Sequence, residues 1–164
     1  MAKRRTKSNA TTVSPDAIEE PELYQVLDYD GSIIGELPDI DPAKLRKMYE
    51  TMLLIRLLDE RMMILQRQGR IGFYGACTGQ EATPIATAAA LEDRDWIFPA
   101  LREGSAMLYR GFSLETYICQ VFGNSGDVTK GRQMPSHQAS RTVNQVSWGS
   151  CIGTQLPQAM GAAW

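Results

Sequence analysis

The connector at residues 67–82, RQGRIGFYGACTGQEA, constrains this chain more than any other segment, because it separates two regions with strong helical patterns. Its glycines and aromatic residues are Gly69, Gly72, Phe73, Tyr74, Gly75 and Gly79. Glycine is costly in regular structure, but it lets the backbone turn sharply or approach another group closely. The pattern therefore indicates a site between two helices. A tight loop that only joins the helices is an equally open alternative.

A long helix is predicted before the connector. Asp41 is a good N-cap residue, and Pro42 fits the first helical position. Apolar residues then recur at spacings of three and four as far as Leu65, and Gly69 supplies a stop signal. These signals predict an amphipathic helix from about residue 42 to residue 68, with its methionines packed in the core.

A second helix is predicted after the connector. Thr78 and Glu81 have the spacing of a capping box, which places the helix start near Thr78. Pro84 fits poorly beyond a first turn, because it removes a backbone hydrogen bond. The helix therefore either begins later than Thr78 or bends at Pro84.

The other expected elements are shorter. They are a hairpin at 24–35, a strand at 95–99, helices at 102–110 and 113–122, a polar loop at 123–140, a strand at 142–148 and a helix from 153. A strand, a Gly/Ser turn and a small-residue helix are typical of the start of an α/β sheet. We expect an α/β fold that is helix-rich and whose sheet is incomplete in this chain. Residues 1–22 are expected to be a disordered tail, and residues 23–164 the N-terminal part of a larger domain truncated at 164.

Composition excludes several classes of protein. The net charge of −2 gives no electrostatic case for binding nucleic acid or an anionic membrane, and no apolar run is long enough to span a bilayer. The three cysteines are far apart and lack C-x-x-C spacing, which argues against a disulfide framework or a zinc site. No apolar stretch follows the basic N-terminus, so a secretory signal is not expected. We therefore predict a cytoplasmic location.

Two candidate site residues are Arg102, at the start of the predicted helix 102–110, and His137, in the predicted loop 123–140. Arg102 follows a predicted strand, where α/β folds present ligand-binding groups, and its planar guanidinium suits a phosphate or a carboxylate. A surface ion pair with Glu103 or another nearby acid is the equal alternative. His137 is the only histidine, but an acid–base role needs a partner and a pocket, and a bystander role is favoured.

Residues 149–155, GSCIGTQ, place hydroxyls and an amide at a predicted strand-to-helix turn. Carbonyl, hydroxyl and amide oxygens suit a hard monovalent cation or the polar rim of a ligand. The turn is not a phosphate loop, because the G-x-x-x-x-G-K pattern is absent. Cys151 has no basic neighbour in sequence, so a small packed residue is favoured over a nucleophile.

Five segments in order carry a resemblance to a known family. They are RLLDERMMILQRQGRIGFY (56–74), GQEA (79–82), DWIFPALREG (95–104), GRQMPSH (131–137) and GTQLPQAMGAA (153–163). From about Tyr24 onward the chain resembles the α subunit of the thiamine diphosphate-dependent decarboxylase component of 2-oxo acid dehydrogenase complexes. The resemblance implies a thiamine diphosphate-binding α/β sandwich, with the cofactor held between an α and a β subunit.

The resemblance also implies roles for residues. Arg102 would bind the diphosphate, Ser150 would touch the cofactor, and Ile152 would be the apolar wedge that bends it. Leu101 stands where the family has a cofactor-contacting tyrosine, so that contact is lost. His137 and Tyr74 would lie on the substrate side.

Two metal ions are implied by the same resemblance. Potassium would be held by Gly149, Cys151, Thr154 and Gln155. Gly149 replaces a serine of the family and Cys151 replaces a proline. The Mg²⁺ ligands of the family lie downstream of residue 164, so they are not expected in this chain.

The function implied is oxidative decarboxylation of a 2-oxo acid, with transfer of the acyl group to a lipoyl arm. The GQEA segment and the hairpin favour a pyruvate dehydrogenase α subunit. The GRQMPSH segment favours the alternative, a branched-chain 2-oxo acid dehydrogenase. A non-catalytic role in subunit assembly is the alternative of another class. The implied partners are the β subunit in an α2β2 heterotetramer, the lipoyl acyltransferase core and a 2-oxo acid substrate.

Overall fold

The computed structural model describes residues 24–164, so the predicted tail at 1–22 lies outside the described residues. The chain divides into two units, Met1–Asp39 and Ile40–Trp164, which are described separately. In the first unit, Leu27 and Ile33 form a single antiparallel bridge. The amide of Asp28 donates to the carbonyl of Ser32 at 2.8 Å, and Gly31 takes a φ of 85° at the turn. The predicted hairpin at 24–35 is thus a tight reversal rather than a pair of strands.

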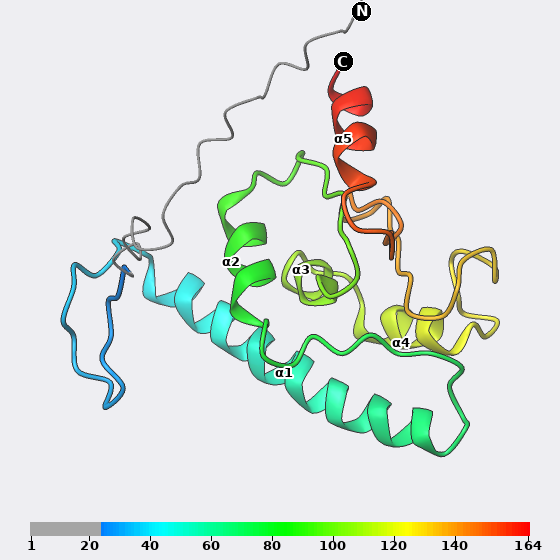
Figure 1. Cartoon of the computed structure of the whole chain (residues 1–164), viewed down its shortest axis with the longest axis horizontal. Helices are drawn as coiled ribbons and strands as arrows, with labels where there is room; N and C mark the ends of the chain where they lie inside the picture. The colour runs from blue at the N-terminus through cyan, green and yellow to red at the C-terminus, as the bar shows by residue number, and fades with distance from the viewer. Residues whose placement is uncertain (1–23) are drawn as a thin grey trace, which may run out of the picture. The chain divides into compact units, whose positions relative to one another are not determined.

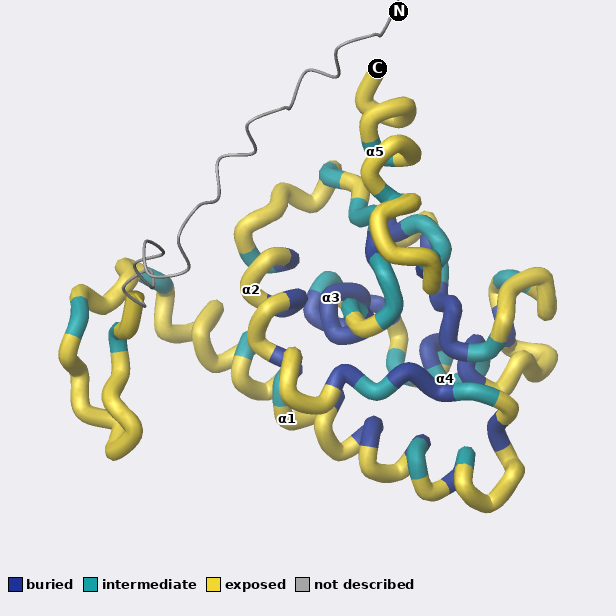
Figure 2. Tube along the Cα trace, viewed as in Figure 1, coloured by how far each residue is buried: buried dark blue, intermediate teal, exposed yellow. Residues whose placement is uncertain are grey.

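Helix α1 (Pro42–Arg67) forms as its sequence predicts (Figure 1). The Asp41 carboxylate accepts the amide of Ala43 at 3.0 Å, Pro42 occupies the first helical position, and Gly69 follows the end with a φ of 70°. One face carries the buried residues Thr51, Ile55, Leu58, Asp59, Met62 and Leu65. Another row at intervals of four is exposed: Leu45, Tyr49, Leu53 and Leu57. Figure 2 shows this alternation of buried and exposed positions along the helix.

Helix α2 (Ala82–Ala90) begins later than the capping-box spacing predicts. Thr78 and Glu81 do not cap it, because their side chains are bonded to other partners described below. The later start places Pro84 in the first turn, where its missing N–H costs no helical hydrogen bond. The prediction of a start near Thr78 is therefore wrong, and the late-start alternative for Pro84 is correct.

Three further helices complete the second unit: α3 (Gly104–Tyr109), α4 (Leu114–Phe122) and α5 (Gln155–Ala163). All six residues of α3 are buried, and this helix contacts both α1 and α2. Ser113 caps α4 by accepting the amide of Thr116, and Gly123 ends it in the left-handed conformation. Helix α5 buries none of its residues. No helix of the described part is long and apolar enough to cross a membrane.

Two clusters of buried side chains hold these helices together. The larger joins α1 to the connector, α3 and α4, through residues such as Ile55, Tyr74, Met107 and Tyr117. The smaller joins α2 to α3 through Ile85, Ala88, Ala106 and Tyr109. Helix α3 contributes to both clusters, so it ties α2 to the packing between α1 and α4.

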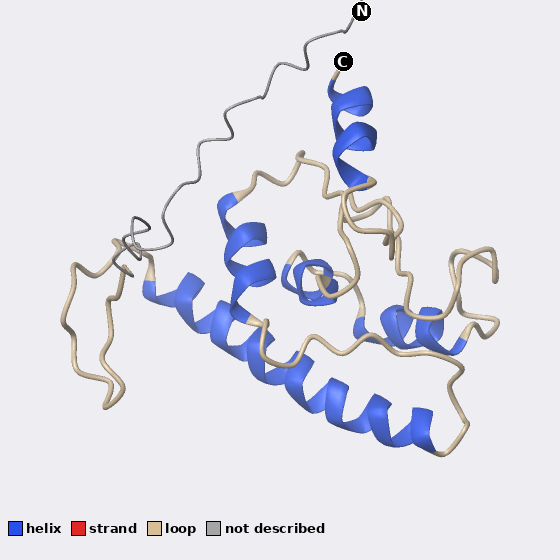
Figure 3. Ribbon diagram, in the orientation of Figure 1, coloured by secondary structure: helices blue, strands red, loops and turns tan. Residues whose placement is uncertain are grey.

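The predicted strands at 95–99 and 142–148 are reduced to short extended segments, and no strand is formed among residues 24–164 (Figure 3). The two segments run parallel: the amide of Ile97 donates to Asn144, the amide of Val146 donates to Ile97, and the amide of Gly149 donates to Pro99, at 2.8, 3.1 and 3.3 Å. The strand prediction over 142–144 is wrong, because residues 141–144 form a turn. The expected helix-rich α/β fold with an incomplete sheet is confirmed.

Candidate functional site

The glycine-rich connector is fastened to α1 by one buried carboxylate. Asp59, only 1% exposed, accepts the hydroxyl of Tyr74 at 2.7 Å, the amide of Cys77 at 2.7 Å and the hydroxyl of Thr78 at 2.8 Å. A buried carboxylate is costly unless it is hydrogen-bonded, and these three donors meet that need. Asp59 therefore fixes the path of the connector across the helix.

A second anchor lies one turn earlier on α1. A guanidinium nitrogen of Arg56 lies 2.8 Å from a carboxylate oxygen of the buried Glu81. The other oxygen of Glu81 accepts the amide of Gly79 at 2.9 Å, where the backbone φ is 89°. Sequence analysis missed Asp59 and this ion pair. Thr78 and Glu81 do share a structural role, but both side chains attach the connector to α1 and neither caps α2.

The middle of the connector meets two segments that are distant in sequence. The amide of Gly75 donates to the hydroxyl of Ser136 at 3.3 Å, and the ring of Phe73 lies 6.0 Å from the ring of His137, centroid to centroid. A Cβ added at Gly75 would lie 3.4 Å from the carbonyl oxygen of Leu101. The connector is thus a surface on which other loops pack closely, as well as a link between helices.

Tyr74 and Cys77 face the protein interior. Burial raises the pKa of the Tyr74 hydroxyl, which donates to Asp59, and raises the pKa of the Cys77 thiol to about 12. Both groups therefore stay protonated near neutral pH, and neither is prepared to act as a nucleophile. The structure places the Tyr74 side chain in the core rather than beside His137.

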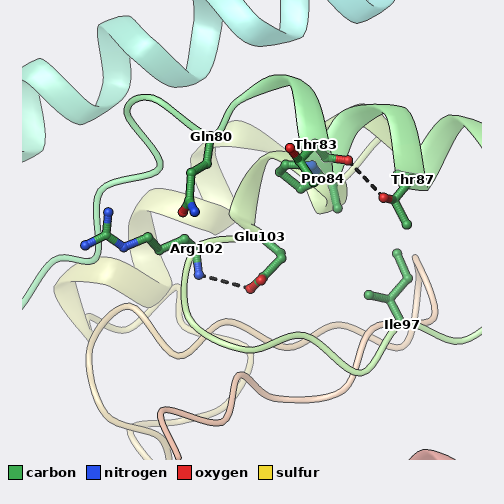
Figure 4. Close-up of a pocket in the computed structure, with 9 residues that line it drawn as sticks. Gln80, Thr83, Pro84, Thr87, Ile97, Arg102 and Glu103 are labelled. Atoms are coloured by element: carbon green, nitrogen blue, oxygen red, sulfur yellow. Dashed lines mark hydrogen bonds between the residues drawn. The ribbon is translucent and has the colours of Figure 1, made fainter. Parts of the chain in front are cut away.

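Arg102 follows the extended segment that ends at Pro99, and its side chain is exposed. Two ion pairs are formed among residues 24–164, and neither includes Arg102. The Glu103 carboxylate instead accepts the backbone amide of Arg102 at 3.0 Å. Arg102, Glu103 and Gln80 line a cavity of about 250 Å³ (Figure 4). The ion-pair alternative for Arg102 is therefore not formed, and its guanidinium is available to a ligand.

His137 and Ser150 form a hydrogen-bonded pair. His137 Nδ1 lies 3.1 Å from the carbonyl oxygen of Pro135, and Nε2 lies 2.5 Å from Ser150 Oγ. A carbonyl can only accept, so Nδ1 carries a proton, and in the tautomer with this single ring proton Nε2 accepts the Ser150 hydroxyl. The partner that sequence analysis did not find for His137 is thus Ser150, another predicted site residue.

The turn at 149–155 closes on itself. The side-chain amide nitrogen of Gln155 lies 2.6 Å from the carbonyl oxygen of Gly149 and 3.4 Å from that of Cys151. The Thr154 hydroxyl donates to the Cys151 carbonyl at 2.9 Å. The residues expected to hold potassium are brought together, but the Gln155 NH2 group, a donor that cannot coordinate a cation, faces the Gly149 and Cys151 carbonyls. The set as it stands does not fit a potassium ion.

Ile152 and Cys151 are exposed on the outside of this turn, with Ile152 98% exposed. No group of three or more His, Cys, Asp or Glu side chains suitable for a metal ion occurs within residues 24–164.

Arg102 and Ser150 follow the ends of two parallel segments that are hydrogen-bonded to each other. The carboxyl ends of such segments meet at one edge, which is where α/β folds bind ligands. The Arg102 guanidinium stands at that edge with no ion pair to any residue of the described part. Such a group fits a diphosphate, because its planar fork binds phosphate oxygens in pairs.

Comparison with known proteins identifies relatives. The family described as "Dehydrogenase E1 component" matches residues 49–164. The 2-oxoisovalerate dehydrogenase subunit alpha, mitochondrial, of Bos taurus is 40% identical over 154 residues, which cover 93% of this chain and 34% of the relative. The alpha 1 subunit of the same name from Arabidopsis thaliana is 47% identical over 144 residues, which cover 86% of this chain and 30% of the relative. The chain therefore spans about a third of the length of these relatives.

Two expectations from the sequence are corrected by these relatives. Their names place them in mitochondria, which contradicts the predicted cytoplasmic location. Their names also specify 2-oxoisovalerate, a branched-chain 2-oxo acid, so the preference for pyruvate is not supported. These relatives therefore favour the branched-chain alternative that the GRQMPSH segment indicates over the interpretation from the GQEA segment and the hairpin.

Proposed function

We propose that this chain forms the α-subunit side of a thiamine diphosphate site in a branched-chain 2-oxo acid dehydrogenase. The premise of this proposal is that the chain belongs to the dehydrogenase E1 component family. The observation that carries the proposal is the exposed Arg102 guanidinium, which has no carboxylate partner among residues 24–164. A guanidinium binds phosphate oxygens in pairs, and such charge-assisted hydrogen bonds are strong.

Arg102 and Ile152 would hold the two ends of the cofactor. Arg102 would bind the diphosphate, and the exposed Ile152 side chain would support the apolar part. Leu101 packs beside Gly75 and offers no polar group, so the diphosphate depends more heavily on Arg102. Thiamine diphosphate, when bound, would supply the carbon that attacks the 2-oxo group and would stabilise the electron pair left behind when carbon dioxide departs.

Ser150 and His137 would control a proton at the same edge. The Pro135 carbonyl would fix a proton on Nδ1 of His137, and Nε2 without a proton would accept the Ser150 hydroxyl. This arrangement allows Nε2 to take up a proton from a group that displaces the Ser150 hydroxyl. The pair would therefore position Ser150 against the cofactor and hold His137 toward the substrate.

Neither of the two metal ions that the resemblance implies, Mg²⁺ and potassium, is assigned to residues of the described part. No group of three or more His, Cys, Asp or Glu side chains within residues 24–164 is suited to hold the Mg²⁺ that would accompany the diphosphate, so no residue is assigned to it. For potassium, the closed turn at Gly149 and Gln155 does not fit the ion, and no step is assigned to it.

The partners proposed are the β subunit, in an α2β2 heterotetramer, and the lipoyl acyltransferase core. Support comes from the family and from the exposed apolar residues of α5, Leu156 and Met160, on a helix that buries nothing within the described part. Exposed apolar surface of this kind is typical of a subunit interface. A role in assembly alone is the competing function.

The test uses the full-length protein together with its β subunit. Titration calorimetry with thiamine diphosphate and Mg²⁺ should show saturable binding, and the loaded enzyme should decarboxylate 2-oxoisovalerate in preference to pyruvate. Binding without decarboxylation of either acid, or no binding at all, would support the assembly role instead. A preference for pyruvate would overturn the substrate assignment alone.

A further inference from the structure

We propose that Glu103 is a positioning residue: its carboxylate fixes the backbone of Arg102 and so directs the Arg102 guanidinium to where the diphosphate would bind. This inference rests on the proposed function. An acidic side chain next to a diphosphate-binding arginine is unfavourable in two ways, because it can neutralise the arginine and it repels the phosphate. Its presence here calls for a structural reason.

The structure supplies that reason in the hydrogen bonds of Glu103. Its carboxylate accepts the backbone amide of Arg102 at 3.0 Å, and its own carbonyl accepts the amide of Ala106 at 3.0 Å. Figure 4 shows the Arg102 side chain extending away from the Glu103 carboxylate, which is joined by a dashed line to the Arg102 backbone nitrogen. Glu103 therefore binds the backbone of Arg102 and does not form an ion pair with its guanidinium.

The next residue fixes this turn from the inside. Gly104 is buried, and a Cβ at this position would lie 2.8 Å from Cζ2 of Trp148. The side chain of Tyr117 lies against the same position. The residue that follows Glu103 is thus packed directly against these two rings.

The test compares Glu103→Ala with Glu103→Gln in the full-length protein with its β subunit. Glutamine keeps an oxygen that can accept the Arg102 amide, whereas alanine does not. Glu103→Ala should raise the Kd for thiamine diphosphate about fivefold, the loss expected for one backbone hydrogen bond, and Glu103→Gln should leave it within about twofold. Glu60→Ala removes an equal charge from the exposed face of α1 and is the matched control.

A second readout does not depend on the cofactor. Without cofactor, hydrogen exchange at the Arg102 amide should become about tenfold faster in Glu103→Ala and stay unchanged in Glu103→Gln. Tighter cofactor binding by Glu103→Ala would overturn the inference, because it would show that repulsion dominates. Unchanged exchange at the Arg102 amide would overturn it as well.

Arg102→Ala separates this inference from the proposed function. If Arg102→Ala weakens binding while Glu103→Ala does not, the positioning role is wrong and the assignment of Arg102 stands. If Arg102→Ala leaves binding unchanged, the proposed diphosphate site itself is wrong, and the inference falls with it.

Discussion

The turns after Pro99 and after Gly149 follow two neighbouring parallel segments, but they differ in how far their polar groups are bonded within the protein. In the first, Glu103 binds the backbone, and the Arg102 guanidinium forms no ion pair within residues 24–164. In the second, the Gln155 amide satisfies the carbonyls of Gly149 and Cys151. Residues suited to a ligand are therefore not sufficient for a site. A site also requires that the protein leave those residues unsatisfied.

The largest effect should come from crowding the first turn. Gly104→Ala would place a methyl group against the rings of Tyr117 and Trp148, both buried. Overpacking of this kind should lower the free energy of unfolding by about 3 kcal/mol. Urea denaturation measures the change. Gly161→Ala, at a helical position with nothing within 4 Å, is the control and should not destabilise.

The next largest effect should come from removing the Arg102 guanidinium. Arg102→Ala should weaken thiamine diphosphate binding by about 2 kcal/mol, or about 30-fold, because a charge-assisted hydrogen bond is lost. Calorimetry at fixed Mg²⁺ measures the affinity. The free energy of unfolding without cofactor should stay unchanged, since the Arg102 side chain is exposed. A large loss of stability instead would mean that Arg102 supports the fold rather than the ligand.

A smaller effect is expected from opening the second turn. Gln155→Leu leaves the carbonyl of Gly149 without its donor at 2.6 Å. Loss of that hydrogen bond should cost about 1 kcal/mol of stability. Thermal unfolding of Gln155→Leu beside Gln158→Leu, an exposed residue on the same helix, isolates the contribution. Equal behaviour of the two variants would show that the turn is not closed by Gln155.

The sequence was sufficient where a structural signal is local. The cap at Asp41, Pro42 at the first helical position, and the α4 helix between Ser113 and Gly123 all formed as predicted. The exposed position of Arg102 after an extended segment also follows from a local feature.

Longer-range contacts could not be predicted from local patterns. Asp59 binds residues 15 to 19 positions away, and Glu81 binds Arg56, which is 25 positions away. Because of these contacts, the residues with capping-box spacing attach the connector to α1 and do not cap α2. The pairing of His137 with Ser150 depends on the parallel segments that bring residues 97–99 beside 144–149. These contacts are made by tertiary packing, which overrides local preference at such sites.

The smallest effect should come from potassium. The Gln155 NH2 group and the Thr154 hydroxyl donate to the Gly149 and Cys151 carbonyls, so donor hydrogens lie beside these oxygens where potassium would have to bind. Replacing sodium chloride with potassium chloride at equal ionic strength should move the thermal midpoint by less than about 1 °C, which is under about 0.5 kcal/mol for a chain of this size. Scanning calorimetry in the two salts makes the measurement, with caesium chloride as a larger-ion control. A rise in the thermal midpoint that is specific to potassium and is abolished by Gln155→Leu would contradict this expectation. It would show that the Gln155 side chain can turn its oxygen toward the ion. The contrast between the two turns would then hold only in the absence of potassium.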